Sequence, residues 1–130
     1  MLDHVGIAVS NLAGALERWK PVVGAPPGAP EEVPSQRVRV VFLEVGATHL
    51  ELLEPTDPAS PVGQFLARRG EGVHHLAFRV PSVDAALAAV ERSGGRLVDR
   101  VGRPGARGRR VGFAHPSAFG GVLLEFVEVP

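Results

Sequence analysis

The sequence predicts an α+β fold in which two tandem βαβββ modules form a half-open barrel. Three observations support this prediction. The two halves of the chain repeat at a nearly constant offset, each half has one helical pattern among strand patterns, and helix-start residues and glycines fall at equivalent places. We expect a single domain over residues 1–130, with module one at about 1–56, a connector at 57–72 and module two at about 73–130.

The internal repeat appears when the sequence is shifted by 71 residues, with a three-residue insertion late in the second half. The matched segments keep their order along the chain and are Asp3–Val9 with His74–Val80, Val40–Phe42 with Val111–Phe113, and Leu50–Glu54 with Leu124–Glu128. Chance easily produces one such match but seldom produces a series in order. The halves are therefore expected to share one fold.

The first half begins with an alternating strand at 2–9, and Ser10-Asn11 then supplies a helix-start signal. A helix is predicted at about 11–20, because apolar residues recur there at spacings of three and four. The strands that follow are predicted near 30–34, where the pattern is fainter, and at about 38–45 and 48–54.

The second half repeats this plan, with a strand at 73–80 and a helix at 82–93 that begins at Ser82. Three more strands are predicted, at 110–115, at 122–128 and, from a fainter pattern, near 96–101. The connector is expected to hold a short helix around Pro61–Arg69.

Composition narrows the classes of function. Basic and acidic residues number 14 each, and a net charge of zero disfavours wholesale binding to nucleic acid or anionic membranes. The sequence contains no cysteine, which excludes disulfides, thiolate metal sites and thiol nucleophiles. No apolar run approaches the roughly 20 residues of a membrane span. A strand pattern starting at Met1 leaves no room for a signal peptide, so we expect a cytoplasmic protein.

The repeat also pairs residues that bind metals, because His4 aligns with His75 and Glu51 aligns with Glu125. Side chains alternate between the faces of a strand, so a histidine on each first strand and a glutamate on each last strand can converge under pseudo-twofold symmetry. Two imidazoles and two carboxylates suit a borderline divalent ion. The sequence therefore predicts a metal site formed by these four residues.

Structural roles are the alternative for each of these residues. A single strand histidine is more often a structural residue than a ligand, whereas a glutamate inside an apolar strand needs a cation or hydrogen-bond partners. His74 should point to the face opposite His75, so it is left out of the site. His49 shares a face with Glu51 and is a candidate for lining the cavity, with an exposed or core position as the alternative.

These residues belong to segments that resemble the methylmalonyl-CoA epimerase family of the vicinal oxygen chelate superfamily, which also includes glyoxalase I and the extradiol dioxygenases. The matching segments run through the whole chain and are Asp3–Val9, Glu51–Pro55, Gly72–Phe78, Phe113–Pro116 and Gly120–Glu125. The most specific piece is the His-Pro pair followed shortly by Gly-Gly-Val-Leu-Leu-Glu.

The resemblance implies a glyoxalase-like fold and a metal-dependent isomerase that interconverts (R)- and (S)-methylmalonyl-CoA by proton transfer through an enolate. It implies His4, Glu51, His75 and Glu125 as ligands of one divalent ion, and Glu125 also as a catalytic residue. We expect Co²⁺, with Mn²⁺, Ni²⁺, Zn²⁺ or Fe²⁺ as alternatives, an acyl-CoA substrate and a homodimer.

Two departures from the family pattern bear on mechanism. Val40 lies where some relatives carry a second catalytic glutamate, and Ser117 stands where a basic residue usually follows His-Pro. The first leaves the second proton-transfer group unassigned, with His49 as a candidate. The second leaves open how CoA is held, and the arginine-rich segment 100–110 is either a phosphate-binding loop or a solvated hairpin.

Other functions remain alternatives at this point. Glyoxalase I (lactoylglutathione lyase) uses a similar ligand set and also moves a proton beside a carbonyl. An extradiol dioxygenase fits less well, because an iron facial triad has two histidines and one carboxylate rather than four ligands. A protein of another class, which binds or sequesters a small molecule without catalysis, would not need the paired histidines and glutamates.

Overall fold

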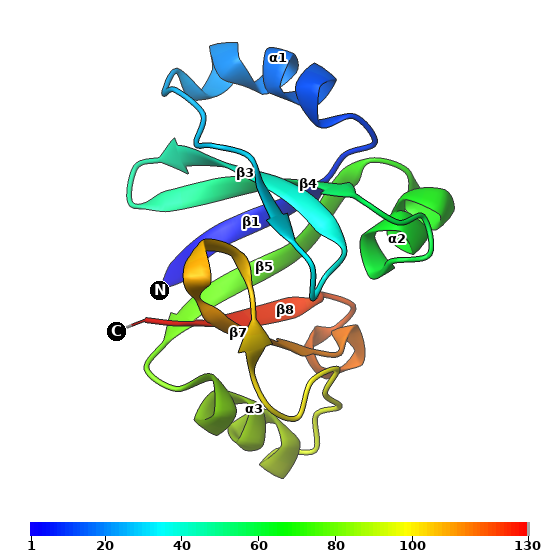
Figure 1. The fold of residues 1–130 in the computed structure, drawn as a ribbon. Helices are drawn as coiled ribbons and strands as arrows, with labels where there is room; N and C mark the ends of the chain where they lie inside the picture. The colour runs from blue at the N-terminus through cyan, green and yellow to red at the C-terminus, as the bar shows by residue number, and fades with distance from the viewer. Residues whose placement is uncertain (130) are drawn as a thin grey trace. The chain divides into compact units, whose positions relative to one another are not determined.

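The computed structural model describes residues 1–129, which form two compact units. The N-terminal unit is His4–His74, and the C-terminal unit joins Met1–Asp3 to the residues from His75 onward. Figure 1 labels the main elements of both. No helix within residues 1–129 is long and apolar enough to cross a membrane.

The N-terminal unit has strand order β2-β3-β4-β1, with β1 and β4 parallel and the other neighbours antiparallel. Its elements are β1 (Leu2–Ala8), α1 (Leu12–Val23), β2 (Glu31–Val33), β3 (Val38–Val45), β4 (Thr48–Pro55) and α2 (Pro61–Arg69). The predicted strands and the connector helix of this half are confirmed.

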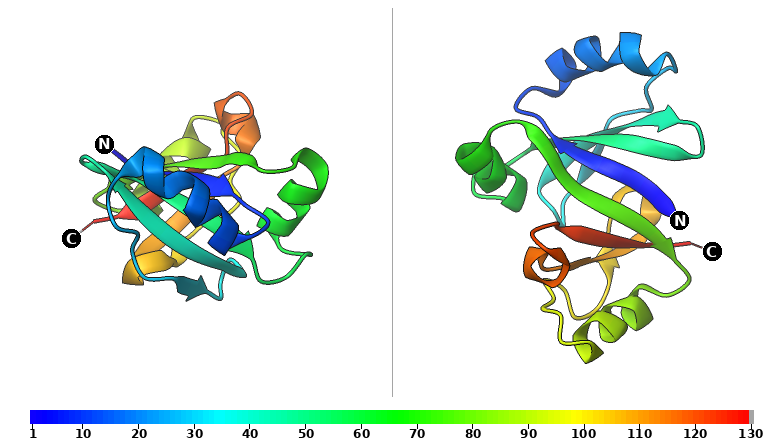
Figure 2. Two further views of the ribbon diagram at one scale, coloured as in Figure 1. Left: turned by 90° about the horizontal axis from the view of Figure 1, so that it is seen from above. Right: turned by 180° about the vertical axis from the view of Figure 1, so that it is seen from behind.

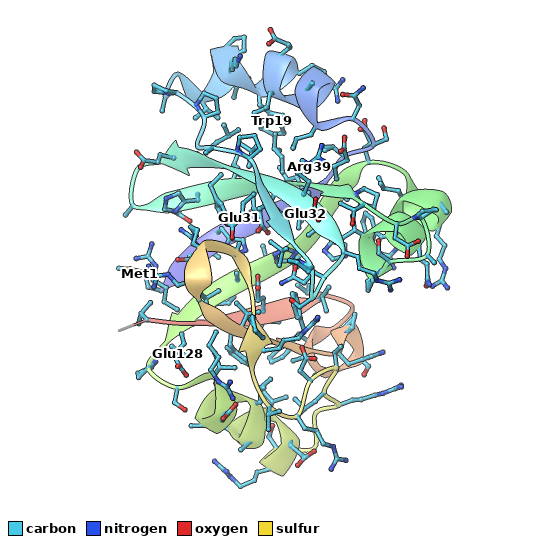
Figure 3. The ribbon with its side chains drawn as sticks, in the orientation of Figure 1. Met1, Trp19, Glu31, Glu32, Arg39 and Glu128 are labelled. Atoms are coloured by element: carbon cyan, nitrogen blue, oxygen red, sulfur yellow. The ribbon has the colours of Figure 1, made fainter. Side chains whose placement is uncertain are left out.

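Helix α1 covers one face of this sheet and contacts β3 and β4 (Figures 1 and 2). Its Leu12 and Ala15 are buried, and Trp19 points from the helix toward the sheet (Figure 3). The helix extends beyond the predicted end, through Pro21 to Val23. It stops there because Gly24, at φ 77°, donates its backbone N–H to the carbonyl of Lys20.

The C-terminal unit repeats this plan with strand order β5-β8-β7-β6, in which β5 and β8 are parallel. Its elements are β5 (Gly72–Val80), α3 (Val83–Arg92), β6 (Arg103–Pro104), β7 (Arg110–Ala114), β8 (Leu124–Glu128) and the short 3₁₀ helices η1 (Ala106–Gly108) and η2 (Pro116–Phe119). Helix α3 lies against β7 and β8 (Figures 1 and 2).

The strand predicted near 96–101 is wrong, because this segment is a loop and the edge strand β6 lies further along the chain. Leu97 forms only an isolated bridge with Ala114. The Asp99 carboxylate accepts the Phe113 N–H at 3.0 Å and so takes the place of a strand carbonyl. Strand β8 also begins two residues later than predicted, after Gly120 and Gly121 at positive φ.

The N-terminus of the helix is capped in the same way in both units. Asn11 and Ser82 are the N-caps, and each accepts a backbone N–H from the first turn. In addition, Glu54 at the end of β4 accepts the Leu12 N–H at 2.7 Å, and Glu128 at the end of β8 accepts the Val83 N–H at 2.9 Å. The aligned glutamates therefore perform the same structural task in both units.

Candidate metal centre

In the N-terminal unit, β1 and β4 bring a buried histidine and a buried glutamate together. The Nε2 atom of His4 lies 3.3 Å from Oε1 of Glu51, and the two side chains are 3% and 5% exposed. The parallel register places Gly6 opposite Glu51 and His4 opposite His49. Alternation sends Val5 and Ile7 to the face that packs beneath α1, so His4 and Glu51 project from the other face.

The C-terminal unit contains the equivalent pair on β5 and β8. The Nε2 atom of His75 lies 3.1 Å from Oε1 of Glu125, with the side chains 1% and 5% exposed. Here the register places Ala77 opposite Glu125, and Ala77 stands two residues from His75, on the same face of β5. Each unit therefore pairs one buried histidine with one buried glutamate on two neighbouring parallel strands.

A phenylalanine on the third strand packs against the histidine in each unit, a feature to which the sequence analysis assigned no role. The Phe42 and His4 rings meet edge to face with centroids 5.5 Å apart, and the Phe113 and His75 rings do so at 5.8 Å. The repeat aligns Val40–Phe42 with Val111–Phe113, so the signal was present in the sequence. These contacts restrict rotation of the imidazoles that face the glutamates.

The separations within the pairs suit shared coordination. Two ligand atoms about 2.1 Å from one ion are about 3.0 Å apart at a 90° angle and about 3.4 Å apart at the tetrahedral angle. The observed 3.3 Å and 3.1 Å fall within this range, and both exceed the 2.7–2.9 Å typical of a charge-assisted hydrogen bond. A buried carboxylate also needs a compensating cation, so the donor set fits a divalent metal ion.

The other two histidines that the sequence analysis weighed lie in different surroundings. His74 packs against Phe65 of α2 with ring centroids 5.0 Å apart, consistent with its exclusion from the site. His49 lies two residues from Glu51 on β4 and meets Phe42 edge to face at 6.0 Å. Its Nδ1 atom is buried and has no hydrogen-bond partner within residues 1–129, so this atom has capacity to bind another polar group.

Comparison with known proteins gives the family. Residues 3–113 match the Glyoxalase/Bleomycin resistance protein/Dioxygenase superfamily. The chain belongs to this superfamily. Its relatives there include the mitochondrial methylmalonyl-CoA epimerase of Bos taurus, which is 38% identical over 128 residues covering 98% of this chain and 73% of the bovine protein. The ethylmalonyl-CoA/methylmalonyl-CoA epimerase of Cereibacter sphaeroides is 37% identical, over 98% of this chain and 97% of that protein.

A solved structure of this superfamily supports the same grouping. A variant of the Streptomyces coelicolor methylmalonyl-CoA epimerase, in complex with 2-nitronate-propionyl-CoA, matches with a TM-score of 0.92 and 38% identity. The match covers 100% of this chain and 98% of the Streptomyces chain. The predicted resemblance and the predicted glyoxalase-like α+β fold are therefore confirmed.

Proposed function

We propose that this protein is a methylmalonyl-CoA epimerase, which interconverts the (R) and (S) forms of methylmalonyl-CoA by moving the proton at C2. The observation that carries this proposal is the pair of buried His–Glu contacts at equivalent positions of the two units, His4 with Glu51 and His75 with Glu125. The epimerases among its relatives, one of them solved with an acyl-CoA analogue, support an acyl-CoA substrate.

We further propose that both pairs bind the same divalent ion. All four residues are buried and of types that could hold a metal ion. A bound ion would supply Lewis-acid stabilisation of the negative charge that develops on the thioester oxygen when C2 loses its proton. Co²⁺ is the ion expected from the family, and a homodimer in the cytoplasm likewise stays a prediction.

Glu125 is the proposed base that takes the C2 proton onto its carboxylate. It projects from an apolar strand and is 4% exposed. The His75 Nε2 atom lies 3.1 Å from its Oε1, and exclusion of water strengthens electrostatic interactions at this position. A carboxylate placed this way can act as a general base when the substrate's C–H lies within reach.

Epimerisation also needs a second group that delivers a proton to the opposite face of C2. Val40 is fully buried and aliphatic, so the position where some relatives carry a glutamate cannot serve here. Glu51 is the structural counterpart of Glu125, with its own histidine partner, and we propose it as the second proton-transfer group. His49, with its buried Nδ1, is proposed to line the substrate cavity beside it.

Solvent exchange at C2 tests the function directly. The metal-loaded protein should replace the C2 hydrogen of methylmalonyl-CoA with deuterium from D₂O and should convert pure (S) substrate to the (R) form. The hemithioacetal of methylglyoxal and glutathione, the substrate of a glyoxalase I, should not react. Turnover of the glutathione adduct alone would replace this proposal by a glyoxalase, and failure with both substrates would refute the epimerase.

A further inference from the structure

The C-terminal unit contains a cavity of about 430 Å³ beside the last residues of β8. No residue of the two His–Glu pairs lines it, and the labelled Glu128 in Figure 3 marks its place in the fold. The residues that line it are Arg107, Gly108, Arg109, Arg110, Glu128 and Val129. The cavity is thus built largely from the arginine-rich segment that precedes β7.

Ion pairs distinguish one arginine of this segment from the others. Four of its five arginines have a carboxylate partner, and these pairs are Arg100 with Glu91, Arg103 with Asp99, Arg107 with Asp3, and Arg110 with Asp84. Arg109 has no Asp or Glu within salt-bridge distance among residues 1–129. Its Nη1 donates only a long hydrogen bond, 3.4 Å, to the carbonyl of Glu128. A half-buried guanidinium with several unused donors is suited to an anion.

Glu128, the acidic residue in the lining, does not form an ion pair with Arg109 among residues 1–129. The Oε1 atom of Glu128 accepts the Val83 N–H at 2.9 Å and so is directed to the start of α3. Glu128 keeps its negative charge in the lining, but within residues 1–129 no ion pair joins its carboxylate to Arg109. An anion that entered it would find a cation already in place.

The backbone of the loop is held in an unfavourable conformation. Arg107 adopts φ 60° and ψ 28°, a left-handed backbone conformation that residues other than glycine rarely adopt. Gly108 follows at φ 67°. The Arg107 guanidinium is tied by a 2.7 Å ion pair to Asp3, a carboxylate that is 2% exposed and also accepts from Arg79 at 2.8 Å. Such strained residues are common in ligand-binding loops, and Arg109 follows this one by two residues.

We propose that this cavity binds the phosphate groups of the substrate's CoA moiety, with Arg109 as the main cationic contact. Guanidinium groups bind phosphate oxygens through paired, charge-assisted hydrogen bonds. Val129 in the lining follows Glu125 by four residues, which is roughly 13 Å along an extended chain. The pantetheine arm that separates the thioester from the phosphates can span such a distance. This inference rests on the proposed acyl-CoA epimerase function.

Substrate truncation tests the assignment. Arg109→Ala should raise KM for methylmalonyl-CoA at least about tenfold, the size expected for loss of a hydrogen bond to a charged group, with little change in kcat. KM for methylmalonyl-pantetheine, which carries no phosphate, should be the same in the variant and the wild type. Arg109→Lys should restore part of the loss. Arg100→Ala is the matched control, because Arg100 belongs to the same segment, is 85% exposed and does not line the cavity.

Three results would overturn the proposal. Arg109→Ala could change KM for both esters equally, which would indicate a structural role, or Arg100→Ala could change it as much, which would indicate general attraction. Calorimetric titration with CoA and with adenosine 3′,5′-bisphosphate could also show the same affinity for wild type and Arg109→Ala. If the wild-type protein exchanged the proton of neither ester, the epimerase function would be refuted, and calorimetry would still decide whether the cavity binds CoA phosphates.

Discussion

Replacement of Glu125 by glutamine separates its proposed chemical role from its structural one. Glutamine has nearly the same volume and keeps an oxygen that can ligate a metal, but it is not basic. Because the side chain is 4% exposed and lies 3.1 Å from His75, the isosteric change should leave the packing intact. A well-placed general base contributes about 10²–10⁴-fold, equivalent to about 3–5 kcal/mol of activation free energy.

The assay follows the C2 hydrogen of each pure epimer by NMR in D₂O. If Glu125 and Glu51 serve opposite faces of C2, Glu125→Gln should lose exchange by 10²–10⁴-fold for one epimer and retain it for the other. Glu51→Gln should show the reverse preference, and neither variant should epimerise at an appreciable rate. Glu44→Gln, an exposed glutamate on β3, is the control and should behave as wild type.

Several outcomes would contradict this reasoning. Near-normal exchange of both epimers by Glu125→Gln would show that another group is the base. Loss of exchange for both epimers in one variant, with a parallel fall in metal content by mass spectrometry, would show that the substitution removes the ion rather than the base. Glu125→Gln could lose exchange of one epimer while Glu51→Gln has no effect on either. That result would show that Glu51 is not the second proton-transfer group.

The remaining predictions concern the metal, the packing, the surface charge and the assembly. Addition of Co²⁺ to chelator-treated protein should raise Tm, because an ion at 100 times its Kd stabilises the folded state by about 2.7 kcal/mol. His4→Ala should abolish this rise, and equal Tm shifts in both proteins would contradict a metal site that includes His4. Gly112→Ala should cost about 1–3 kcal/mol in denaturant unfolding, because its Cβ would lie 2.8 Å from Leu87 Cδ1; unchanged stability would show that α3 can move away. The Gly102 N–H, and after it the Arg110 guanidinium, lowers the pKa of the Asp84 carboxyl; its stabilisation is therefore present above about pH 3.9 and lost as pH falls. The free energy of unfolding of Asp84→Asn should therefore vary less with pH, between about 5 and 3, than that of the wild type. An unchanged pH profile would exclude a contribution of the Asp84 carboxylate to stability. Light scattering should find a dimer, and a monomer at micromolar concentration would contradict the expected assembly.

The helices and strands that the sequence predicted correctly are those with clear local patterns. The strand and helix periodicities, and capping residues such as Asn11 and Ser82, act within a few positions along the chain, so they can be recognised without the fold. The segment 96–101 has a strand-like pattern but is a loop, because Asp99 binds Phe113, fourteen residues away. Gly24, which the sequence indicates as a stop for the first helix, is the C-cap of α1, so only the three residues before it were missed.

For the site, the sequence by itself determined which residue types stand at equivalent positions, because duplication preserves spacing and strand alternation sets the facing side. The tertiary structure alone decided which atoms meet. It placed Glu51 3.3 Å from His4 and Glu125 3.1 Å from His75. It also joined Asp3 to Arg107, 104 residues away. Contacts at such separations depend on strand register and loop conformation across a whole unit, and no periodicity in the chain encodes them.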